Sequence, residues 1–405
     1  MKKFMLYNIY IAFIERTDKN KMGNSSDGFI RILHCADVHI GAQNYYLRTK
    51  AKQRCAEILM TFEKIVNICK NEHIELMLIA GDLFDSNHIE NSSLRQVKHL
   101  LASIPETFVA ISAGNHDYIT SDSPYVTSKW PPNVHIFATS MESVTVPGKN
   151  VRVWGCSFPT PYIENSLIRN IHIPDDGYIN IMVMHGEFVS ENQQSKYNPI
   201  TKSNLAYCGM DYVALGHIHQ SSSVHQANRT FFAYSGCPES QGFDETGLKG
   251  VYTGLVSKGN CNLTFRPVQK RIYITMQSDV TGLKNQDEII NAVYEKMKNN
   301  YGENYRDNIY RVTFTGTLQT AFPIDFIQIE MKLSEEIFFI QVRNYTRPDI
   351  NLDELASEFT LKGIFVRKML QQLRSAPDPI TRNNIEKALY LGLSAFEGEV
   401  KYYEN

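Results

Sequence analysis

The segment Leu76-Met77-Leu78-Ile79-Ala80-Gly81-Asp82-Leu83-Phe84-Asp85 joins five consecutive apolar residues to a turn that carries two carboxylates. An uninterrupted apolar run of this length is typical of a β-strand that is covered on both faces, as in parallel sheets. Gly81 ends the run, so Asp82 is expected directly after the strand. Ligands of open α/β sheets bind at the carboxyl ends of the strands, which makes Asp82 a candidate site residue.

The same arrangement, an apolar run followed by Asp, Asn or His, occurs at four other places. The four stretches are Asp37-Val38-His39, Gly114-Asn115-His116-Asp117, Met184-His185-Gly186 and Gly216-His217-Ile218-His219. Because the carboxyl ends of parallel strands meet at one edge of a sheet, we expect these side chains to gather there. This set of carboxylates, imidazoles and one amide is larger than one ion needs, and it indicates a two-metal site. The imidazoles disfavour calcium and magnesium.

Helical periodicity separates the first three predicted strands. Apolar residues at helical spacing predict one helix from Cys55 to Cys69 and a second from Leu94 to Ile104. After Trp130-Pro131-Pro132 the apolar runs become shorter. They predict a second sheet from residues 134–137, 144–146 and 151–154. Two later runs, at 231–234 and 250–256, are typical of closing strands. The expected fold class is α/β, a two-sheet layered domain flanked by helices.

Changes of pattern divide the chain into four predicted parts. Residues 1–29 are expected to be an extension outside the core, and residues 30–270 to form the layered domain. Residues 271–347 have the pattern of a small α+β unit, and residues 348–405, after the stop at a proline, that of a helical tail. An apolar run near the start is too short to span a bilayer and lacks a signal-peptide cleavage pattern. A chain start at Met22 is the alternative.

Composition restricts the partners and the compartment. The chain has 405 residues, a formal net charge of -2 and a pI of about 6.6. Without a global basic excess, a nucleic-acid partner must be inferred from local patches. The seven cysteines are scattered, odd in number and never spaced as CxxC. This pattern favours reduced thiols in a cytoplasmic protein over a disulfide framework or a zinc knuckle.

A local basic patch follows the first motif. Its members are Arg48, Lys50, Lys52 and Arg54. The patch predicts contacts with substrate phosphates beside the metal site, and a solvated helix face is the alternative. Tyr45 and Tyr46 precede it and are candidates either for stacking on an unpaired base or for ordinary packing.

The motifs DxH, GDxxD, GNHD, H and GHxH, in this order, make the sequence similar to the calcineurin-like metallophosphoesterases. The flanking residues resemble the SbcD family of DNA repair nucleases, and within it the YhaO-like members of Gram-positive bacteria. The residues that carry this likeness are Leu33 to Gly41, Gly81 to Asp85, Tyr234 to Glu239 and Phe243 to Gly247. Beyond about residue 256 the resemblance is one of layout only.

The resemblance implies two divalent metal ions, with manganese as the metal. Asp37, His39 and His219 would hold the first ion, and Asn115, His185 and His217 the second. Asp82 would bridge them, because a carboxylate has two oxygens that can each face an ion.

The remaining motif residues have other expected roles. His116 would face the scissile phosphate, as the acid for the leaving oxygen or as a stabiliser of charge. Asp85 and Asp117 are expected either to orient the ligands or to stabilise turns. His34 matches the family motif, but its place inside a strand predicts a core residue or one that supports the ligands from behind.

The resemblance implies a metal-dependent phosphodiesterase of the DNA exonuclease type, which hydrolyses DNA with a metal-bridged hydroxide as the nuclease subunit of an SbcCD-like repair complex. The alternatives are a phosphatase or cyclic-nucleotide phosphodiesterase for small substrates, and a scaffold without chemistry. No GxxxxGK[ST] motif occurs, so the ATPase of such a complex must be another chain.

The resemblance also implies partners, namely DNA, a second copy of the chain and an SMC-like (SbcC-type) ATPase. The tail helices would bind the ATPase through apolar anchors three and four residues apart. Those anchors are Phe365, Met369, Leu370 and Leu373. The alternative is that the tail packs back as ordinary core.

Overall fold

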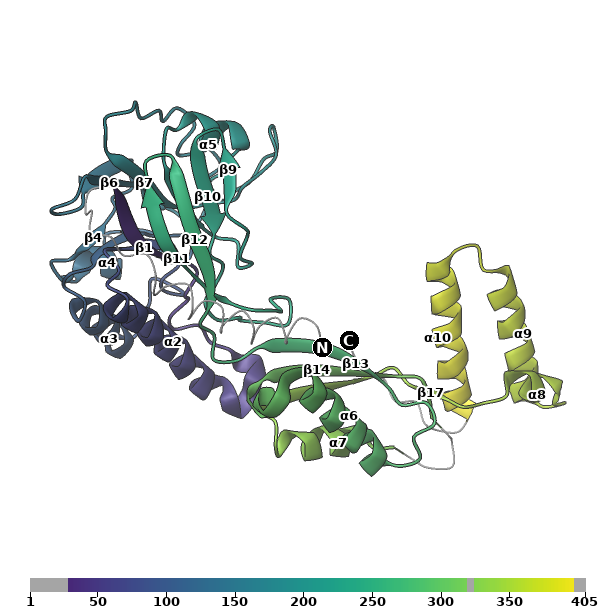
Figure 1. The fold of residues 1–405 in the computed structure, drawn as a ribbon. Coiled ribbons are helices and arrows are strands. Elements are labelled where there is room, and N and C mark those ends of the chain that lie inside the picture. The colour runs from purple at the N-terminus through teal and green to yellow at the C-terminus, as the bar shows by residue number, and fades with distance from the viewer. Residues whose placement is uncertain (1–27, 319–323, 397–405) are drawn as a thin grey trace. The chain divides into compact units, whose positions relative to one another are not determined.

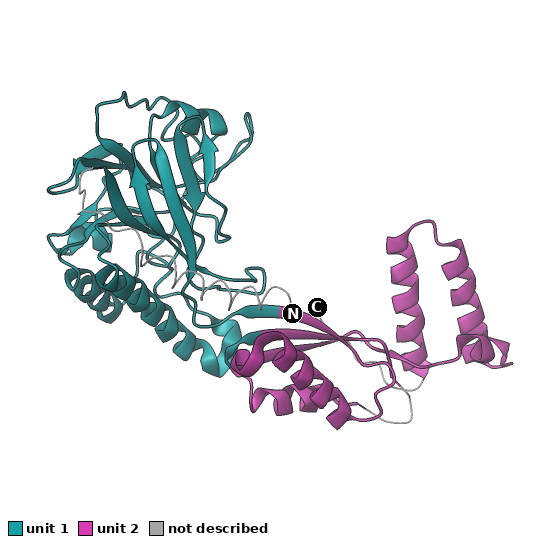
Figure 2. Cartoon of the chain, in the orientation of Figure 1, with its two compact units in different colours: residues 1–274, 307–309 teal, residues 275–306, 310–405 magenta. Residues whose placement is uncertain are grey.

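The structure is a computed structural model that describes residues 28–318 and 324–396 (Figure 1). It divides into two compact units, residues 1–274 with 307–309, and residues 275–306 with 310–405 (Figure 2). Most of the predicted extension lies outside the described residues. Its last residue, Phe29, already begins the first strand and pairs with Ser257.

The first sheet of unit 1 has the order β12-β11-β1-β2-β3-β4. Its strands are β1 (Phe29–Cys35), β2 (Leu76–Ala80), β3 (Phe108–Ser112), β4 (Val134–Ile136), β11 (Gly250–Ser257) and β12 (Asn260–Pro267). Strands β1 to β4 are parallel, and β11 runs antiparallel beside β1. The three predicted strands that precede Asp37, Asp82 and Asn115 are therefore neighbours.

The second sheet has the order β5-β6-β7-β8-β10-β9. Its strands are β5 (Glu142–Thr145), β6 (Val151–Gly155), β7 (Ile179–His185), β8 (Tyr212–Gly216), β9 (His225–Ala227) and β10 (Thr230–Tyr234). Strands β6, β7, β8 and β10 are parallel. The two-sheet layered fold predicted from the sequence is confirmed.

One strand belongs to a different sheet than predicted. Residues 134–137 were expected in the second sheet, but β4 pairs with β3, where Val109 opposes Val134. The peptide N–H of Phe137 also donates to the Ile111 carbonyl, at 2.9 Å. The turn before β4 brings it to the open edge of β3, a pairing that a local pattern does not encode.

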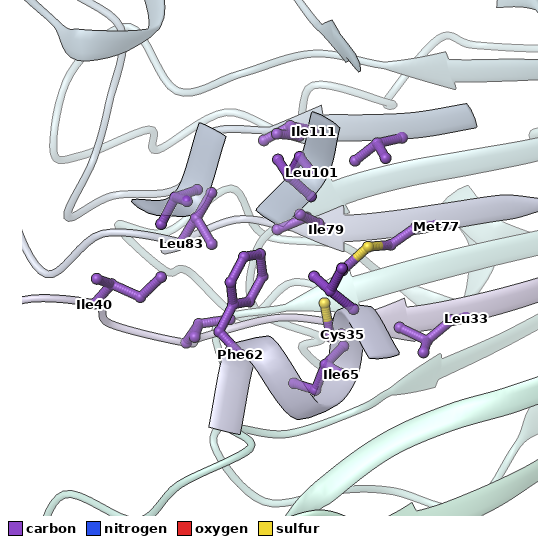
Figure 3. Close-up of a cluster of buried hydrophobic side chains, with 14 of the residues drawn as sticks. Leu33, Cys35, Ile40, Phe62, Ile65, Met77, Ile79, Leu83, Leu101 and Ile111 are labelled. Atoms are coloured by element: carbon purple, nitrogen blue, oxygen red, sulfur yellow. The ribbon is translucent and has the colours of Figure 1, made fainter. Parts of the chain in front are cut away.

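Side chains alternate along the central strands and fill two apolar layers. Leu76, Leu78 and Ala80 of β2 face the second sheet, where they pack with residues of β7 and β8. Met77 and Ile79 face the opposite way and pack against Phe62 and other helix residues (Figure 3). The covering helices are α2 (Ala51–Asn71), which follows the 3-10 helix η1 (Tyr45–Lys50), and α3 (Asn91–Ala102). Two short helices, α4 (Pro124–Thr127) and α5 (Lys202–Tyr207), lie elsewhere in the unit.

Unit 2 contains the α+β pattern expected after residue 270. Its elements are β13 (Tyr273–Asp279), α6 (Gln286–Tyr301), η2 (Gly302–Asp307), β14 (Ile309–Thr315), β15 (Thr317–Leu318), α7 (Phe326–Ser334), β16 (Phe339–Asn344) and β17 (Arg347–Pro348). The main sheet has the order β13-β14-β16, and β15 pairs with β17. The apolar stripe of α6, which includes Ile289, Val293 and Met297, is buried.

The tail consists of α8 (Leu352–Ser357), α9 (Leu361–Ser375) and α10 (Pro379–Phe396). Its centre is a small cluster formed by Val366, Leu389 and Leu393. The four predicted partner anchors are partly buried against this cluster, so the tail itself covers much of their apolar surface. Among the described residues, no helix has the length and apolarity that crossing a bilayer requires.

Candidate metal centre

The predicted site residues lie at the carboxyl ends of five strands in two facing sheets. Asp37, Asp82 and Asn115 follow β1, β2 and β3, His185 ends β7, and His217 follows β8. The layer between the sheets is apolar, so the polar residues gather only where the strands stop. Asp37, Asp82 and His185 are buried, and one ligand atom of each lies within 4.8 Å of the others.

Several of these residues have a backbone conformation that non-glycine residues rarely adopt. The φ angles are 53° at Asp37, 51° at His39, 50° at Asp82 and 103° at His217. Such conformations cost about 1–3 kcal/mol each and cluster at functional sites. The sharp turns direct each side chain back across the strand ends.

The positions of the glycines that precede Asp82 and Asn115 have no room for a side chain. A Cβ atom at Gly81 would lie 2.2 Å from His185 Nδ1, and one at Gly114 would lie 2.2 Å from Asp82 Oδ1. The GD and GN pairs of the sequence are thus explained. In each case a site residue from another strand occupies the space beside the glycine.

The first ligand set consists of Asp37, His39 and His219. One ligand atom of each lies within 4.8 Å of the others, and the Nε2 atoms of the two histidines are 3.2 Å apart. When both rings carry their proton on Nδ1, neither Nε2 has a hydrogen to donate to the other, so two lone pairs face each other. Their convergence therefore fits a common cation.

The second ligand set consists of Asn115, His185 and His217. Asn115 Oδ1 lies 2.9 Å from His185 Nε2 and 3.2 Å from His217 Nδ1. The Nδ1–H of His185 donates to the Ala80 carbonyl at 3.0 Å, which leaves the lone pair on Nε2 toward Asn115. An amide oxygen and two imidazole nitrogens thus meet at one position.

Asp82 lies between the two sets. Its Oδ2 is 3.4 Å from His185 Nε2 and 3.9 Å from His39 Nε2. Its Oδ1 accepts a hydrogen bond from the backbone N–H of His116 at 2.9 Å. Oδ2 thus lies near imidazoles of both sets, and the bridging of two ions by Asp82 stays a prediction.

Charge at the centre also fits cations. The side chain of Asp82 is 2% exposed and that of Asp37 is 0% exposed, and their contacts are with backbone N–H groups and imidazoles. Buried carboxylates are costly unless they are paired or bind a metal. Two divalent ions would compensate them, and the mixed oxygen and nitrogen donors suit such ions.

The imidazoles differ in how readily they take a proton. Burial lowers the pKa of His39, but its hydrogen bond with Asp85 and the charges of Asp82 and Asp37 outweigh burial and raise the pKa to about 9. Burial and the neighbouring His185 lower the pKa of His217 to about 3. A metal-binding imidazole must be neutral, so ion binding competes with a proton at His39 and also at His219, where the hydrogen bond with Glu245 and the charge of Asp37 outweigh burial and raise the pKa.

His116 is exposed and lies over the first ligand set. Its Nδ1 is 3.1 Å from the Asp85 carbonyl, to which it donates, and its ring packs edge-on against His39 at 4.8 Å between centroids. One of its ring nitrogens also lies within 4.8 Å of ligand atoms of His39 and Asp82. Its position suits contact with a substrate phosphate or, alternatively, with an ion.

Asp85 and Asp117 lie behind the ligands. Asp85 Oδ1 is 3.2 Å from His39 Nδ1. Asp117 is buried and accepts hydrogen bonds from Gly114 N at 2.7 Å, Phe84 N at 3.1 Å and Tyr125 Oη at 2.5 Å. Asp85 thus orients a ligand, and Asp117 ties two of the turns together.

The structure corrects the predicted basic patch. Arg54 is 0% exposed, and its Nη2 donates to Glu239 Oε2 at 2.6 Å. It cannot contact a substrate, because helical spacing puts it on the buried face with Ile58 and Phe62. Arg48 and Lys52 are exposed and Lys50 is half-buried, so the prediction stands for these three.

The sequence motifs did not identify Glu245 as a site residue. Its Oε1 lies 2.6 Å from His219 Nδ1, and this contact lowers the pKa of the Glu245 carboxyl to about 2 against the opposing effect of burial. Glu245 stands in the long connection between β10 and β11 and follows no strand end. Its only signal in the sequence is its place in the stretch Phe243 to Gly247 that resembles the family.

His34 is the core residue that its position predicted. It is 0% exposed, its Nε2 donates to the Leu215 carbonyl at 3.1 Å, and its Nδ1 accepts from Tyr212 Oη at 2.8 Å. Burial lowers its pKa to about 3. All seven cysteine thiols are free, as expected.

Comparison with known proteins agrees with the site. Residues 30–221 match the family model described as calcineurin-like phosphoesterase. The chain is 26% identical over 274 residues to the uncharacterized metallophosphoesterase YhaO of Bacillus subtilis (strain 168). The alignment covers 65% of this chain and 66% of YhaO, so this chain spans just under two thirds of the length of YhaO. It is 25% identical over 300 residues to the DNA double-strand break repair protein Mre11 of Saccharolobus solfataricus, covering 67% of this chain and 73% of that protein.

Among solved structures, the calcineurin-like phosphoesterase YfkN of Bacillus subtilis aligns with a TM-score of 0.39 and 14% identity, over 68% of this chain and 98% of that one. The family match and the motif residues gathered at the strand ends agree on the same part of the chain. Residues 30–221, just under half of the chain, thus match the calcineurin-like metallophosphoesterases.

Proposed function

We propose that this metallophosphoesterase is a DNA nuclease that uses two divalent ions, with manganese as the metal. The observation that carries the proposal is the convergence of two ligand sets on Asp82 Oδ2, with His116 exposed beside it. Two ions held in this way supply a nucleophile from water and neutralise phosphate charge. The DNA substrate is proposed from the similarity to Mre11 proteins, whose name describes double-strand break repair.

The residues around the ions have distinct parts in this proposal. Asp37, Asp82, Asn115 and the four ligand histidines would hold the ions. His116 donates from Nδ1 to the Asp85 carbonyl, which fixes the ring and leaves Nε2 to protonate the leaving oxygen or to stabilise charge on the phosphate.

An aromatic surface beside the second ligand set supports a nucleic-acid substrate. The ring of Tyr197 lies 4.6 Å from that of His217, and Tyr162 lies 5.8 Å from Tyr197, both between centroids. Tyr162 is 58% exposed, and Lys196 Nζ lies 5.9 Å from its ring centroid. Aromatic rings next to a cation are the groups on which unpaired bases stack.

The test is a nuclease assay with Mn²⁺ on labelled single-stranded and double-stranded DNA, with a simple phosphomonoester and a cyclic nucleotide run beside it. We expect the protein to cleave DNA. Cleavage should stop when the ions are chelated and return when Mn²⁺ is added. Turnover of the phosphomonoester or the cyclic nucleotide without cleavage of DNA would instead establish a small-substrate enzyme. Two metals bound without turnover of any substrate would establish a scaffold.

We also propose that the tail binds an SMC-like ATPase, as the SbcD resemblance implies. The supporting observation is apolar surface that the tail leaves exposed. Phe359 is 104% exposed, Leu361 72% and Ile380 75%. These residues replace the four predicted anchors as the proposed contact, because the anchors pack partly inside the tail.

A further inference from the structure

The two ligand sets differ in the groups that contact the Nδ1 atoms of His39, His219 and His185, on the side of each ring away from the expected ion. In the first set, Nδ1 of His39 faces Asp85 and Nδ1 of His219 faces Glu245. In the second set, Nδ1 of His185 faces a backbone carbonyl, that of Ala80. A carboxylate partner makes an imidazole a more basic ligand and fixes its tautomer and orientation. Both imidazoles of the first set therefore have a carboxylate partner, and one of these carboxylates, Glu245, comes from outside the motifs that supply the ligands.

Glu245 is itself held at both oxygens. Oε1 accepts from His219 Nδ1 at 2.6 Å, and Oε2 accepts from the backbone N–H of Gln241 at 2.8 Å. The thiol of Cys237 lies 3.5 Å from Oε2, and the Glu245 side chain is only 16% exposed. Its carboxylate therefore has little freedom to leave the imidazole.

The same segment also holds the backbone of His219. The ammonium group of Lys249, a residue that is 2% exposed, donates to the His219 carbonyl at 2.8 Å. The backbone N–H of Cys237 donates to the same oxygen at 3.2 Å. Residues 237–249 thus fix both the ring and the peptide of this one ligand.

The segment is anchored to the rest of unit 1 by Glu239. Its Oε2 accepts from Arg54 Nη2 at 2.6 Å, and its Oε1 accepts from Thr61 Oγ1 at 2.5 Å and from the backbone N–H of Lys270 at 2.5 Å. Glu239 and Arg54 are both buried. The ion pair that removes Arg54 from the basic patch therefore fixes the segment that carries Glu245.

We propose that Glu245 is a positioning residue for the first metal position, where it fixes the Nδ1–H tautomer of His219 and presents Nε2 to the ion. This inference rests on the two-metal centre of the proposed function and adds a residue to it. It predicts that loss of Glu245 weakens one ion and spares the other. A loss in metal affinity of about 10–100-fold is the usual effect of removing such a partner.

The test is titration of the metal-free, full-length protein with Mn²⁺, followed by calorimetry and by electron paramagnetic resonance. The variants are Glu245→Ala, Glu245→Gln and, as a matched control, Asp244→Asn, which removes one negative charge from the exposed neighbouring residue. Glu245→Ala is expected to bind one ion with wild-type affinity and the other about 10–100-fold more weakly. At Mn²⁺ concentrations that load both wild-type positions, the signal of a coupled ion pair should then be replaced by that of a single ion.

The Gln variant separates positioning from a general structural effect. Its amide oxygen still accepts from Nδ1–H, although its NH2 group cannot accept from the Gln241 N–H, so we expect it to restore part of the lost affinity, with Asp244→Asn equal to wild type. Wild-type affinity for both ions in Glu245→Ala would overturn the inference, and so would equal weakening in the Ala and Gln variants. A wild-type chain that binds no Mn²⁺ would overturn the metal centre as well, whereas two bound ions without nuclease activity would overturn the proposed function alone.

Discussion

Asp82 connects the two ligand sets through one atom. Its Oδ2 faces both His39 and His185, while its Oδ1 is engaged by the backbone of His116. The carboxylate therefore holds the backbone of His116 and would also hold the ions, so a substitution at Asp82 should affect metal content and catalysis together.

We predict that Asp82→Ala abolishes activity and lowers the bound metal. Both ions lose a shared ligand in this variant, and a glycine-lined space opens beside His185. Elemental analysis of the purified variant measures metal per chain, and the nuclease assay measures turnover. Two metals per chain with full turnover would contradict the bridging role.

His116→Asn should separate chemistry from metal binding. Asparagine keeps a polar side chain but cannot act as an acid, so metal content should stay near that of the wild type. The cleavage rate should fall by about two to four orders of magnitude, the usual contribution of general acid–base help. A loss of metal in proportion to activity would show that His116 is a ligand, which its position within 4.8 Å of His39 and Asp82 allows.

At the scale of the elements, helix α2 has two faces with different roles. Its inner face packs Ile58 and Phe62 against the first sheet and also buries Arg54. Its outer face exposes Lys52. The two cations are two residues apart, and only the one on the outer face can contact DNA.

Arg54→Ala should therefore change mainly the stability of the protein, and Lys52→Ala mainly its binding to DNA. Arg54→Ala should destabilise the protein by about 3–5 kcal/mol, because it leaves the buried Glu239 without its partner. Lys52→Ala should leave the unfolding midpoint unchanged and weaken DNA binding, more so at low salt. Urea unfolding and DNA binding at two salt concentrations measure both effects. A drop in DNA affinity for a stable Arg54→Ala variant would restore Arg54 to the patch.

Strands β1 and β8 are tied across the two sheets by His34, and this contact predicts a pH dependence. Burial lowers the folded-state pKa of His34 from 6.5 to about 3, so the unfolded chain takes up the proton first as the pH falls. The stability that neutral His34 contributes is present above about pH 6.5 and is lost progressively toward pH 3.

His34→Gln removes this titration. The variant should be less stable than the wild type at pH 7, and the difference should shrink by about 2 kcal/mol between pH 6.5 and pH 5, at about 1.4 kcal/mol per pH unit. Urea unfolding of both proteins at several pH values measures the difference. A difference that is constant with pH would show that His34 does not titrate in this way.

At the scale of the whole molecule, the tail has contacts of its own. Helices α9 and α10 share the cluster of Val366, Leu389 and Leu393. Within unit 2 the guanidinium of Arg347 also pairs with Glu386. The metal ligands all lie in unit 1, so removal of the tail removes none of them.

Truncation before Asn351 should leave metal binding and basal Mn²⁺-dependent nuclease activity, and it should abolish co-purification with the SMC-like ATPase. The double variant Phe359→Ser with Leu361→Ser is the matched control, because it keeps the tail and removes exposed apolar surface. It should lose the ATPase as well. A truncated chain that still co-purifies would refute the partner proposal, and one that is unfolded by circular dichroism would favour the tail as ordinary core.

Features that a local pattern encodes could be predicted from the sequence. Apolar runs of strand length and helical spacing predicted β1, β2, β3, β7, β8, α2 and α3, because burial on one or two faces imposes a period on neighbouring residues. The polar residue after each run predicted the site, because parallel strands end at one edge of a sheet. The assignment of these residues to two ligand sets around Asp82 came from the resemblance to the calcineurin-like metallophosphoesterases, and the structure brings their side chains together.

Three contacts could not be predicted and are seen only in the folded chain. They are the pairing of β4 with β3, the burial of Arg54 against Glu239 and the contact of Glu245 with His219. The tertiary structure also decided which oxygen of Asp82 faces both ligand sets, and how much of the tail's apolar surface the tail itself covers. Each of these depends on which distant segment fills the neighbouring space. Periodicity reports that a residue is buried but does not identify its partner, since the energy of a buried contact depends on groups that are far apart in the chain.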